Sequence, residues 1–164
     1  LPYFDNPKDA RRADRVEQFA LAAAAEAFAQ AGNITADKTR FGTIFATGIG
    51  GLSTLEEQVA ILIEKGPRRV SPFLVPMMMA NASGAAISMR YGLQGPNETI
   101  CTACAASSHA IGYAARLIAY GTCDAVATGG SEAADIASSA ASKTENDTAP
   151  GVQEKKKMLM SDGK

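Results

Sequence analysis

The sequence contains no tryptophan, one histidine and three cysteines among its 164 residues. A small, odd number of cysteines argues against a disulfide framework, so we expect reduced thiols and a cytoplasmic protein. No apolar run reaches the roughly 18 residues of a membrane-spanning helix. The chain opens on Leu1 and Pro2 rather than on a signal peptide. The absence of an initial methionine indicates a fragment or a trimmed chain.

Neither sign of charge is in excess, since 16 Lys and Arg stand against 17 Asp and Glu, for a formal net charge of −1. This balance does not favour nucleic acid or an anionic membrane surface as a partner. The length is typical of one domain that buries a real core. Alanine is abundant and there are 15 glycines, a composition that favours close packing of helices on a sheet.

Hydrophobic spacing predicts helices that alternate with short buried strands. Apolar residues at three- and four-residue steps from Val16 to Ala31 predict a long helix that ends at Gly32. The other predicted elements are strands at 41–47, 97–102 and 125–128, and helices at 54–65 (capped by Ser53 or Thr54), at 71–91 (interrupted at Pro76) and at 105–120. The alternation predicts an α/β fold with a mostly parallel sheet covered by helices.

The character of the sequence changes after residue 134. Residues 1–134 carry the alternating pattern, whereas Ser, Ala, Lys, Asp and Asn dominate residues 135–164. We therefore assign residues 1–134 to one α/β domain and interpret residues 135–164 as a polar tail that is mobile or poorly packed.

Cys104 lies where a strand-like run meets a helical run. The unpaired N–H groups and the positive end of the dipole at a helix N-terminus stabilise a thiolate. The same N–H groups can receive the oxyanion that forms when a thioester carbonyl is attacked. The small neighbours Ala103, Ala105 and Ala106 leave room for a substrate. The pattern indicates a nucleophile and does not identify its substrate.

Other interpretations of the cysteines remain open at this point. A free cysteine is often only a small buried hydrophobe, and Cys101 with Cys104 fits a C-x-x-C redox or half-zinc pattern. A zinc site from Cys101, Cys104, His109 and Cys123 does not have the spacing of known fingers, so we predict no metal. His109 lies five positions after Cys104 within the helix, which favours a capping, packing or exposed role over that of a base.

The glycine-rich run at residues 48–51 resembles part of a dinucleotide fingerprint. It lacks the last glycine, because Ser53 stands there, and no acidic residue follows at the spacing of a ribose site. A tight strand-to-helix turn is the favoured interpretation.

Two further groups have a structural and a functional interpretation. Met77, Met78 and Met79 form either core packing or a deformable pocket wall. Arg68 and Arg69 are either solvated loop residues or a site that attracts an acidic partner.

Several stretches together resemble the condensing enzymes of the thiolase superfamily, and most of all the β-ketoacyl-acyl-carrier-protein synthases of fatty-acid elongation. The resemblance covers about residues 4–134. The stretches are Thr102–Ala105 (nucleophile motif), Phe45–Leu52 (glycine turn), Val75–Asn81 (pocket helix), Tyr91–Pro96 (exit turn), Ala114–Gly121 and Gly129–Glu132.

The resemblance implies half of a thiolase-like layered αβαβα fold, with no cofactor. It implies that Cys104 takes an acyl chain from acyl-carrier protein as a thioester, and that its backbone N–H is one oxyanion donor. Condensation with malonyl-carrier protein and loss of CO2 would then lengthen the chain by two carbons. The residues implied at the substrate are Met79, as the acyl-pocket gate, with Met77, Met78 and Ala103, and those implied at the carrier protein are Arg68 and Arg69. The strand before Cys104 would pair with its copy in a homodimer.

The chain departs from this family in what it lacks. Such enzymes use two histidines and a lysine from their second half, and His109 does not match either histidine. We therefore predict that this chain alone does not condense anything and that Cys104 is still slowly acylated. The alternatives are a non-catalytic carrier-protein or subunit-binding half-domain, which the presence of Cys104 disfavours, and a related polyketide ketosynthase or thiolase.

Overall fold

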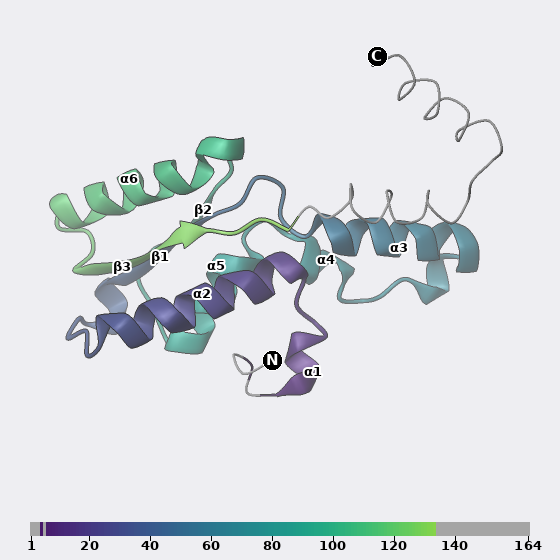
Figure 1. Cartoon of the computed structure of the whole chain (residues 1–164), viewed down its shortest axis with the longest axis horizontal. Coiled ribbons are helices and arrows are strands. Elements are labelled where there is room, and N and C mark those ends of the chain that lie inside the picture. Colours follow the sequence, from purple (N-terminus) through teal and green to yellow (C-terminus); the bar gives the residue numbers. More distant parts are fainter. Residues whose placement is uncertain (1–3, 5, 134–164) are drawn as a thin grey trace, which may run out of the picture. The chain divides into compact units, whose positions relative to one another are not determined.

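The computed structural model describes residues 4 and 6–133 of the chain. A parallel sheet of three strands lies at its centre, formed by β1 (Phe41–Ala46), β2 (Asn97–Ile100) and β3 (Ala125–Gly130) in the order β2-β1-β3 (Figure 1). The central strand β1 pairs with both neighbours, so that Ala46 lies beside Ile100 on one side and Gly130 on the other. All three strands therefore end at one edge of the sheet.

Helices cover both faces of this sheet, as Figure 1 shows. The helices are α1 (Pro7–Ala10), α2 (Arg15–Ala31), α3 (Leu52–Lys65), α4 (Leu74–Met78), α5 (Ala82–Tyr91) and α6 (Ala106–Ala119), with short 3₁₀ turns at Lys38–Arg40, Pro67–Arg69 and Ala103–Ala105. Helices α2 and α5 pack on one face and α6 on the other. The result is α/β layering, and the predicted parallel sheet is confirmed.

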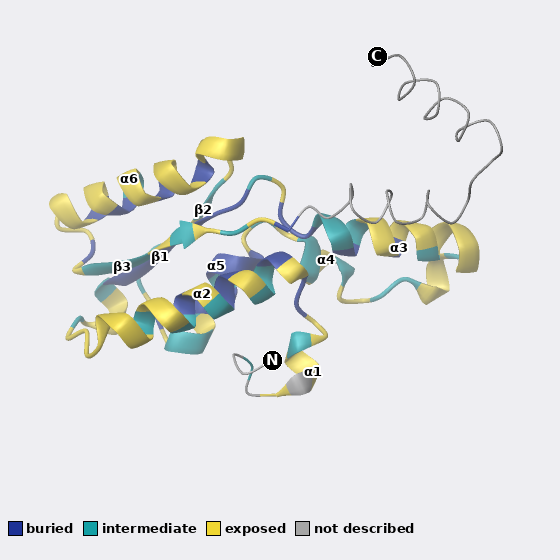
Figure 2. Cartoon of the chain, viewed as in Figure 1, coloured by how far each residue is buried: buried dark blue, intermediate teal, exposed yellow. Residues whose placement is uncertain are grey.

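The side chains of β1 divide the core into two parts. Phe41 and Phe45 face α2 and α5, whereas Ile44 and Ala46 face α6. This follows from the two-residue period of a strand, and β1 reads as a continuous apolar run because both of its faces are buried. Small residues line the inner sides of α2 and α6, which Figure 2 shows as buried. The helices therefore lie close to the sheet, as the alanine content predicts.

The buried carboxylate of Asp14 ties two helices together. Its Oδ1 accepts a hydrogen bond from the Val16 N–H (3.0 Å), and its Oδ2 accepts from the N–H (3.0 Å) and the hydroxyl (2.5 Å) of Thr54. Asp14 is thus the N-cap of α2 and also satisfies a donor in the first turn of α3.

The structure corrects the predicted cap of α3. Neither Ser53 nor Thr54 is the N-cap, because the helix begins at Leu52 after Gly51 and no side chain caps it there. The role falls partly to Asp14, which is 40 positions away from Thr54 in sequence.

The predicted helix at 71–91 is two helices, and its break is not at Pro76. That proline lies in the first turn of α4, where backbone donors lack intrahelical partners and a missing N–H costs little. The chain instead leaves helical geometry at Met79, whose φ and ψ of −63° and 137° are extended. Strand β2 ends at Ile100 rather than at 102, and the predicted tail at 135–164 lies outside the described residues. Within those residues, no helix has the length and apolarity needed to cross a bilayer.

Candidate active site

Cys104 lies in the turn that joins β2 to α6. The 3₁₀ turn Ala103–Ala105 leads directly into α6, and the Cys104 side chain is exposed. This placement agrees with the predicted strand-to-helix junction. Ala103 has a φ of 49° and is the one non-glycine residue with positive φ in the part of the chain described. A strained backbone next to a reactive side chain is a feature of functional sites, because the surrounding structure must maintain it.

An open cavity of about 430 Å³ adjoins Cys104 at the edge where the strands end. It is formed by the ends of β1 and β3, the glycine turn after β1 and the first turn of α6. Its lining residues are Ala46, Thr47, Gly48, Ile49, Ala103, Cys104, Ala106, Ser107, Gly130, Ser131 and Glu132. The carboxyl edge of a parallel sheet is where ligands bind in α/β folds.

The lack of a side chain at Gly130 lets the end of β3 lie close to β1 and α6 at the cavity. A Cβ at Gly130 would lie 3.0 Å from the carbonyl oxygen of Ala46 and would overlap the hydroxyl of Ser107. A larger residue would therefore separate the end of β3 from β1 and α6 at the cavity.

The glycine turn after β1 is held by the carboxylate of Glu132. Oε2 of Glu132 accepts hydrogen bonds from the N–H of Gly48 (2.6 Å) and of Ile49 (3.3 Å), and lies 3.3 Å from the hydroxyl of Thr47. The N–H of Gly50 donates to the Thr47 hydroxyl at 3.1 Å.

These contacts exclude the dinucleotide interpretation of the turn. A phosphate-binding glycine loop presents its N–H groups to the ligand. Here Gly48, Ile49 and Gly50 donate to side chains, and the Gly51 N–H donates to the Met78 carbonyl at 3.2 Å. The predicted tight turn is confirmed, and a carboxylate of the chain itself occupies the donors that an anion would need.

The structure brings only part of the predicted site together. Ala103 lines the cavity with Cys104, but the three methionines do not. Met77 and Met78 are half-buried, and their backbone lies against Gly51, where a Cβ would clash with the Met77 carbonyl. Met79 is 41% exposed. The methionine segment therefore lies against the glycine turn and not in the cavity lining.

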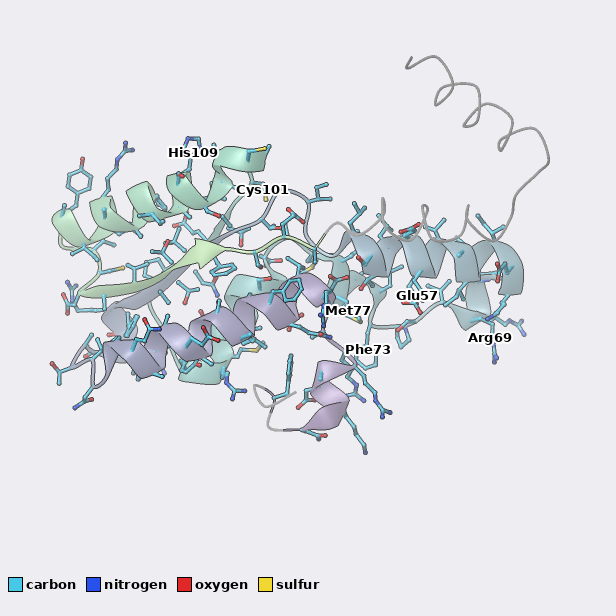
Figure 3. All side chains as sticks on the ribbon, in the orientation of Figure 1. Glu57, Arg69, Phe73, Met77, Cys101 and His109 are labelled. Atoms are coloured by element: carbon cyan, nitrogen blue, oxygen red, sulfur yellow. The ribbon has the colours of Figure 1, made fainter. Side chains whose placement is uncertain are left out.

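Arg68 and Arg69 are exposed in the turn that follows α3. Figure 3 shows Arg69 far from Cys101, at the other end of α3 from the sheet. The backbone after this turn is anchored, because the Ser71 N–H donates to the side-chain oxygen of the buried Gln58 at 2.7 Å.

The remaining cysteines and the histidine lie outside the cavity lining. His109 is exposed on α6, and its Nδ1 lies 2.8 Å from the hydroxyl of Thr102. Cys101 is exposed, whereas Cys123 is buried in the core on the α6 face of the sheet. Among the residues described, no three Cys, His, Asp or Glu side chains gather as a metal site requires. The zinc interpretation therefore has no geometric basis.

Sequence reasoning missed Glu132 as a residue of the site. It follows the strand that ends at Gly130, and parallel neighbouring strands end at the same edge. That rule would have placed Glu132 beside the end of β1, since β1 and β3 were both predicted.

The fold and the cavity define an α/β domain of the thiolase-like kind, and comparison with known proteins identifies the family. The family model described as "Beta-ketoacyl synthase, N-terminal domain" matches residues 3–147. The chain therefore belongs to the β-ketoacyl synthase family, as its motifs predicted. The match runs past residue 134, where the sequence pattern changes.

Proteins named 3-oxoacyl-[acyl-carrier-protein] synthase 2 are similar to the chain. The protein of Synechocystis is 44% identical over 135 residues, which are 80% of this chain and 32% of the relative. That of Vibrio cholerae is 45% identical over 129 residues, covering 77% and 31% of the two chains. The chain thus spans about a third of the length of these relatives.

Solved ketosynthases have the same fold. A structure titled as a type II polyketide acyl-carrier protein in complex with its ketosynthase matches with a TM-score of 0.73 and 26% identity, over 79% of this chain and 38% of the other. A β-ketoacyl synthase from Burkholderia phymatum matches with a TM-score of 0.61 and 27% identity, over 72% and 30%.

Proposed function

We propose that the chain is the nucleophile-bearing part of a β-ketoacyl-acyl-carrier-protein synthase of fatty-acid elongation, with Cys104 as the residue that carries the acyl chain. One observation carries the proposal: Cys104 is exposed at a strained turn before α6 and faces a cavity at the carboxyl edge of the sheet. The names of the relatives support the reaction class.

The first step is acyl transfer to the thiol. The Cys104 thiolate attacks the carbonyl carbon of an acyl thioester, and the oxyanion that forms is stabilised by N–H groups at the start of α6, including that of Cys104. The bond to the carrier thiol then breaks, and the departing carrier thiolate takes up the proton that Cys104 gave up. The acyl group remains as a thioester on Cys104.

The second step, condensation, belongs to the whole protein. Cleavage of the bond between the malonyl group and its carboxylate releases CO2, and the electron pair left behind attacks the Cys104 thioester. A carbon–carbon bond forms and the Cys104 thiolate departs. The only histidine, His109, lies outside the cavity. We expect this chain alone to accept an acyl group and not to condense it.

Acyl-carrier protein is the proposed partner, in its acyl and malonyl forms. The exposed pair Arg68 and Arg69 is the proposed docking site, because two neighbouring cations attract an acidic partner. The neighbour solved with a carrier protein supports this class of partner. Met79 is proposed as the acyl-pocket gate, with Met77, Met78 and Ala103 beside the bound acyl group.

A homodimer through β2 is also proposed. This strand lies at the edge of the sheet, so its outer backbone groups lack a strand partner within the described residues. Its residues Asn97 and Glu98 are exposed. A cytoplasmic setting is also proposed, because exposed cysteines such as Cys101 and Cys104 stay reduced there.

Mass spectrometry of the chain after exposure to an acyl thioester tests the proposal. One adduct is expected, on Cys104, and it should be absent from the Cys104→Ser variant. The Cys101→Ser variant is the matched control, because that cysteine is also exposed and free; it should be acylated as fast as the unmodified chain. Equal labelling of Cys101, or no labelling at all, refutes the assignment.

A polyketide ketosynthase is the second candidate, favoured by the solved neighbour whose title names one. It predicts the same adduct on Cys104. The two candidates differ in the acyl group preferred: saturated acyl thioesters should acylate faster than polyketone thioesters for a fatty-acid enzyme, and more slowly for a polyketide one.

A further inference from the structure

We infer that Glu132 is a positioning residue for the acylation of Cys104: it fixes the backbone at Gly48 and Ile49 as one wall of the cavity. The inference rests on the proposed function and adds to it a residue that does not take part in bond making. Glu132 lines the cavity with Cys104 and is the one carboxylate among the lining residues.

The contacts of Glu132 fix both its own position and that of the turn. Oε2 accepts from the N–H of Gly48 at 2.6 Å and of Ile49 at 3.3 Å, and also lies 3.3 Å from the Thr47 hydroxyl. Oε1 accepts from the N–H of Ala133 at 3.3 Å, which holds the carboxylate in place. A carboxylate that receives several N–H groups is a strong acceptor, and its bonds are shorter than those of a neutral group.

Gly48 is the residue that permits this approach. A Cβ at Gly48 would lie 2.7 Å from Oε2 of Glu132, closer than carbon and oxygen atoms pack. The backbone of Gly48 is not in the left-handed region, so alanine is compatible with its conformation and acts only by displacing the carboxylate.

The contact between Glu132 and the glycine turn positions Ile49. Its side chain is 57% exposed although it is apolar, and it stands on the rim of the cavity beside Cys104. An apolar side chain on the wall of a cavity can contact an apolar ligand that binds there. The acyl part of the thioester is the ligand that the proposed function supplies. Without Glu132 the Ile49 backbone loses its anchor, and the acyl group loses a defined wall.

Two kinds of reactivity at Cys104 differ in what they require. The intrinsic reaction of the thiol with a small alkylating reagent needs only an exposed sulfur. Acylation by an acyl thioester also needs the substrate to be oriented, which a displaced wall impairs. Loss of Glu132 should therefore slow acylation much more than alkylation.

Hydrogen exchange of the Gly48 and Ile49 amides in the whole chain is the first measurement. Glu132→Ala and Gly48→Ala should each raise exchange at Ile49 by about tenfold or more, because a charged acceptor is lost or displaced. Glu132→Gln, whose carbonyl oxygen still accepts, should change it by less than about threefold. Asp124→Ala is the control: this exposed carboxylate before β3 binds Arg40 away from the cavity, and its loss should leave Ile49 unchanged.

The second measurement is the ratio of two rates at Cys104: acylation by an acyl thioester and alkylation by iodoacetamide. The ratio should fall about tenfold in Glu132→Ala, recover in Glu132→Gln and stay constant in Asp124→Ala. A ratio that is unchanged while exchange rises would make Glu132 merely structural and overturn the inference. So would Ile49 exchange within twofold of the unmodified chain in Glu132→Ala. If the unmodified chain is alkylated but never acylated, the proposed function fails, and the exchange rates alone still decide whether Glu132 holds the turn.

Discussion

Replacing Asp14 with alanine should destabilise the fold more than the loss of one helix cap. Asp14 is 3% exposed, and its two oxygens accept three hydrogen bonds, one from Val16 and two from Thr54. Loss of the N-cap of α2 costs about 1 kcal/mol. The N–H and hydroxyl of Thr54, also buried, would be left without an acceptor, at about 1–3 kcal/mol. We expect a total loss of about 3 kcal/mol in the free energy of unfolding.

Asp37 provides a matched control for this prediction. It also accepts from a backbone N–H and a hydroxyl two residues on, both of Thr39, at 2.8 and 2.7 Å. Asp37 is exposed and caps only a 3₁₀ turn. Asp37→Ala should therefore destabilise the fold much less than Asp14→Ala, since water replaces the lost acceptor. The comparison isolates the buried bonds to Thr54, because both carboxylates accept from the backbone N–H two positions on.

Urea unfolding followed by circular dichroism measures both variants. The measurement is best made at pH 5.5, where the neighbouring Glu17, whose pKa is raised to about 7, keeps its proton in the folded chain. Asp14→Asn, which keeps one accepting oxygen, should fall between the unmodified chain and Asp14→Ala, at a loss of about 2 kcal/mol. Equal losses for Asp14→Ala and Asp37→Ala would refute the argument that the buried bonds to Thr54 carry most of the effect.

Two further variants test other contacts. Burial, and then the charge of Asp14, raise the pKa of Glu17 from 4.5 to about 7, so between these pH values the folded chain binds more protons than the unfolded chain and stability falls as pH rises. Glu17→Gln should remove this slope. Its free energy of unfolding should match that of the unmodified chain near pH 4 and exceed it by about 1–2 kcal/mol at pH 8 once solvent screening is allowed for. A slope retained in urea titrations of Glu17→Gln would contradict the assignment. Gly51→Ala should cost about 2–3 kcal/mol, because its Cβ would clash with the Met77 carbonyl; thermal unfolding checks this, and Gly112→Ala, at an open helical position, should be neutral or stabilising.

Helices and strands that are determined by short-range sequence patterns could be predicted from the sequence. Apolar spacing located α2, and the buried run of β1 followed from its β-branched and aromatic residues. The break at Met79 could not be seen in this way, because no glycine or proline marks it. It follows from packing, since the α4 backbone meets the glycine turn and the Gly51 N–H donates to the Met78 carbonyl. The position of the break is therefore set by contact with the glycine turn and not by the helix propensity of the local residues.

The candidate site shows the same division. Cys104 could be predicted because the chemistry proposed for it depends on the junction of two adjacent elements. Glu132 was missed because its partners Gly48 and Ile49 lie 84 and 83 positions away. Met77, Met78 and Met79 were assigned to a pocket by resemblance, and the cavity at Cys104 does not include them. Resemblance transfers the order of motifs along a chain, whereas a cavity also depends on which neighbouring segments surround it.

The carboxylates of Asp14 and Glu132 both accept hydrogen bonds from backbone N–H groups at the same edge of the sheet. Chain reversals there leave backbone N–H groups without partners at the start of α3 and in the glycine turn, and side chains from distant segments supply the acceptors. The hydroxyls of Ser131 and Ser53 have the opposite role and donate to the carbonyls of Val16 and Ala133. The end of β3 is thereby joined to α2 and α3 by bonds that do not involve Cys104. It follows that loss of the thiol should leave this edge intact, whereas loss of either carboxylate should disturb it while leaving the thiol in place.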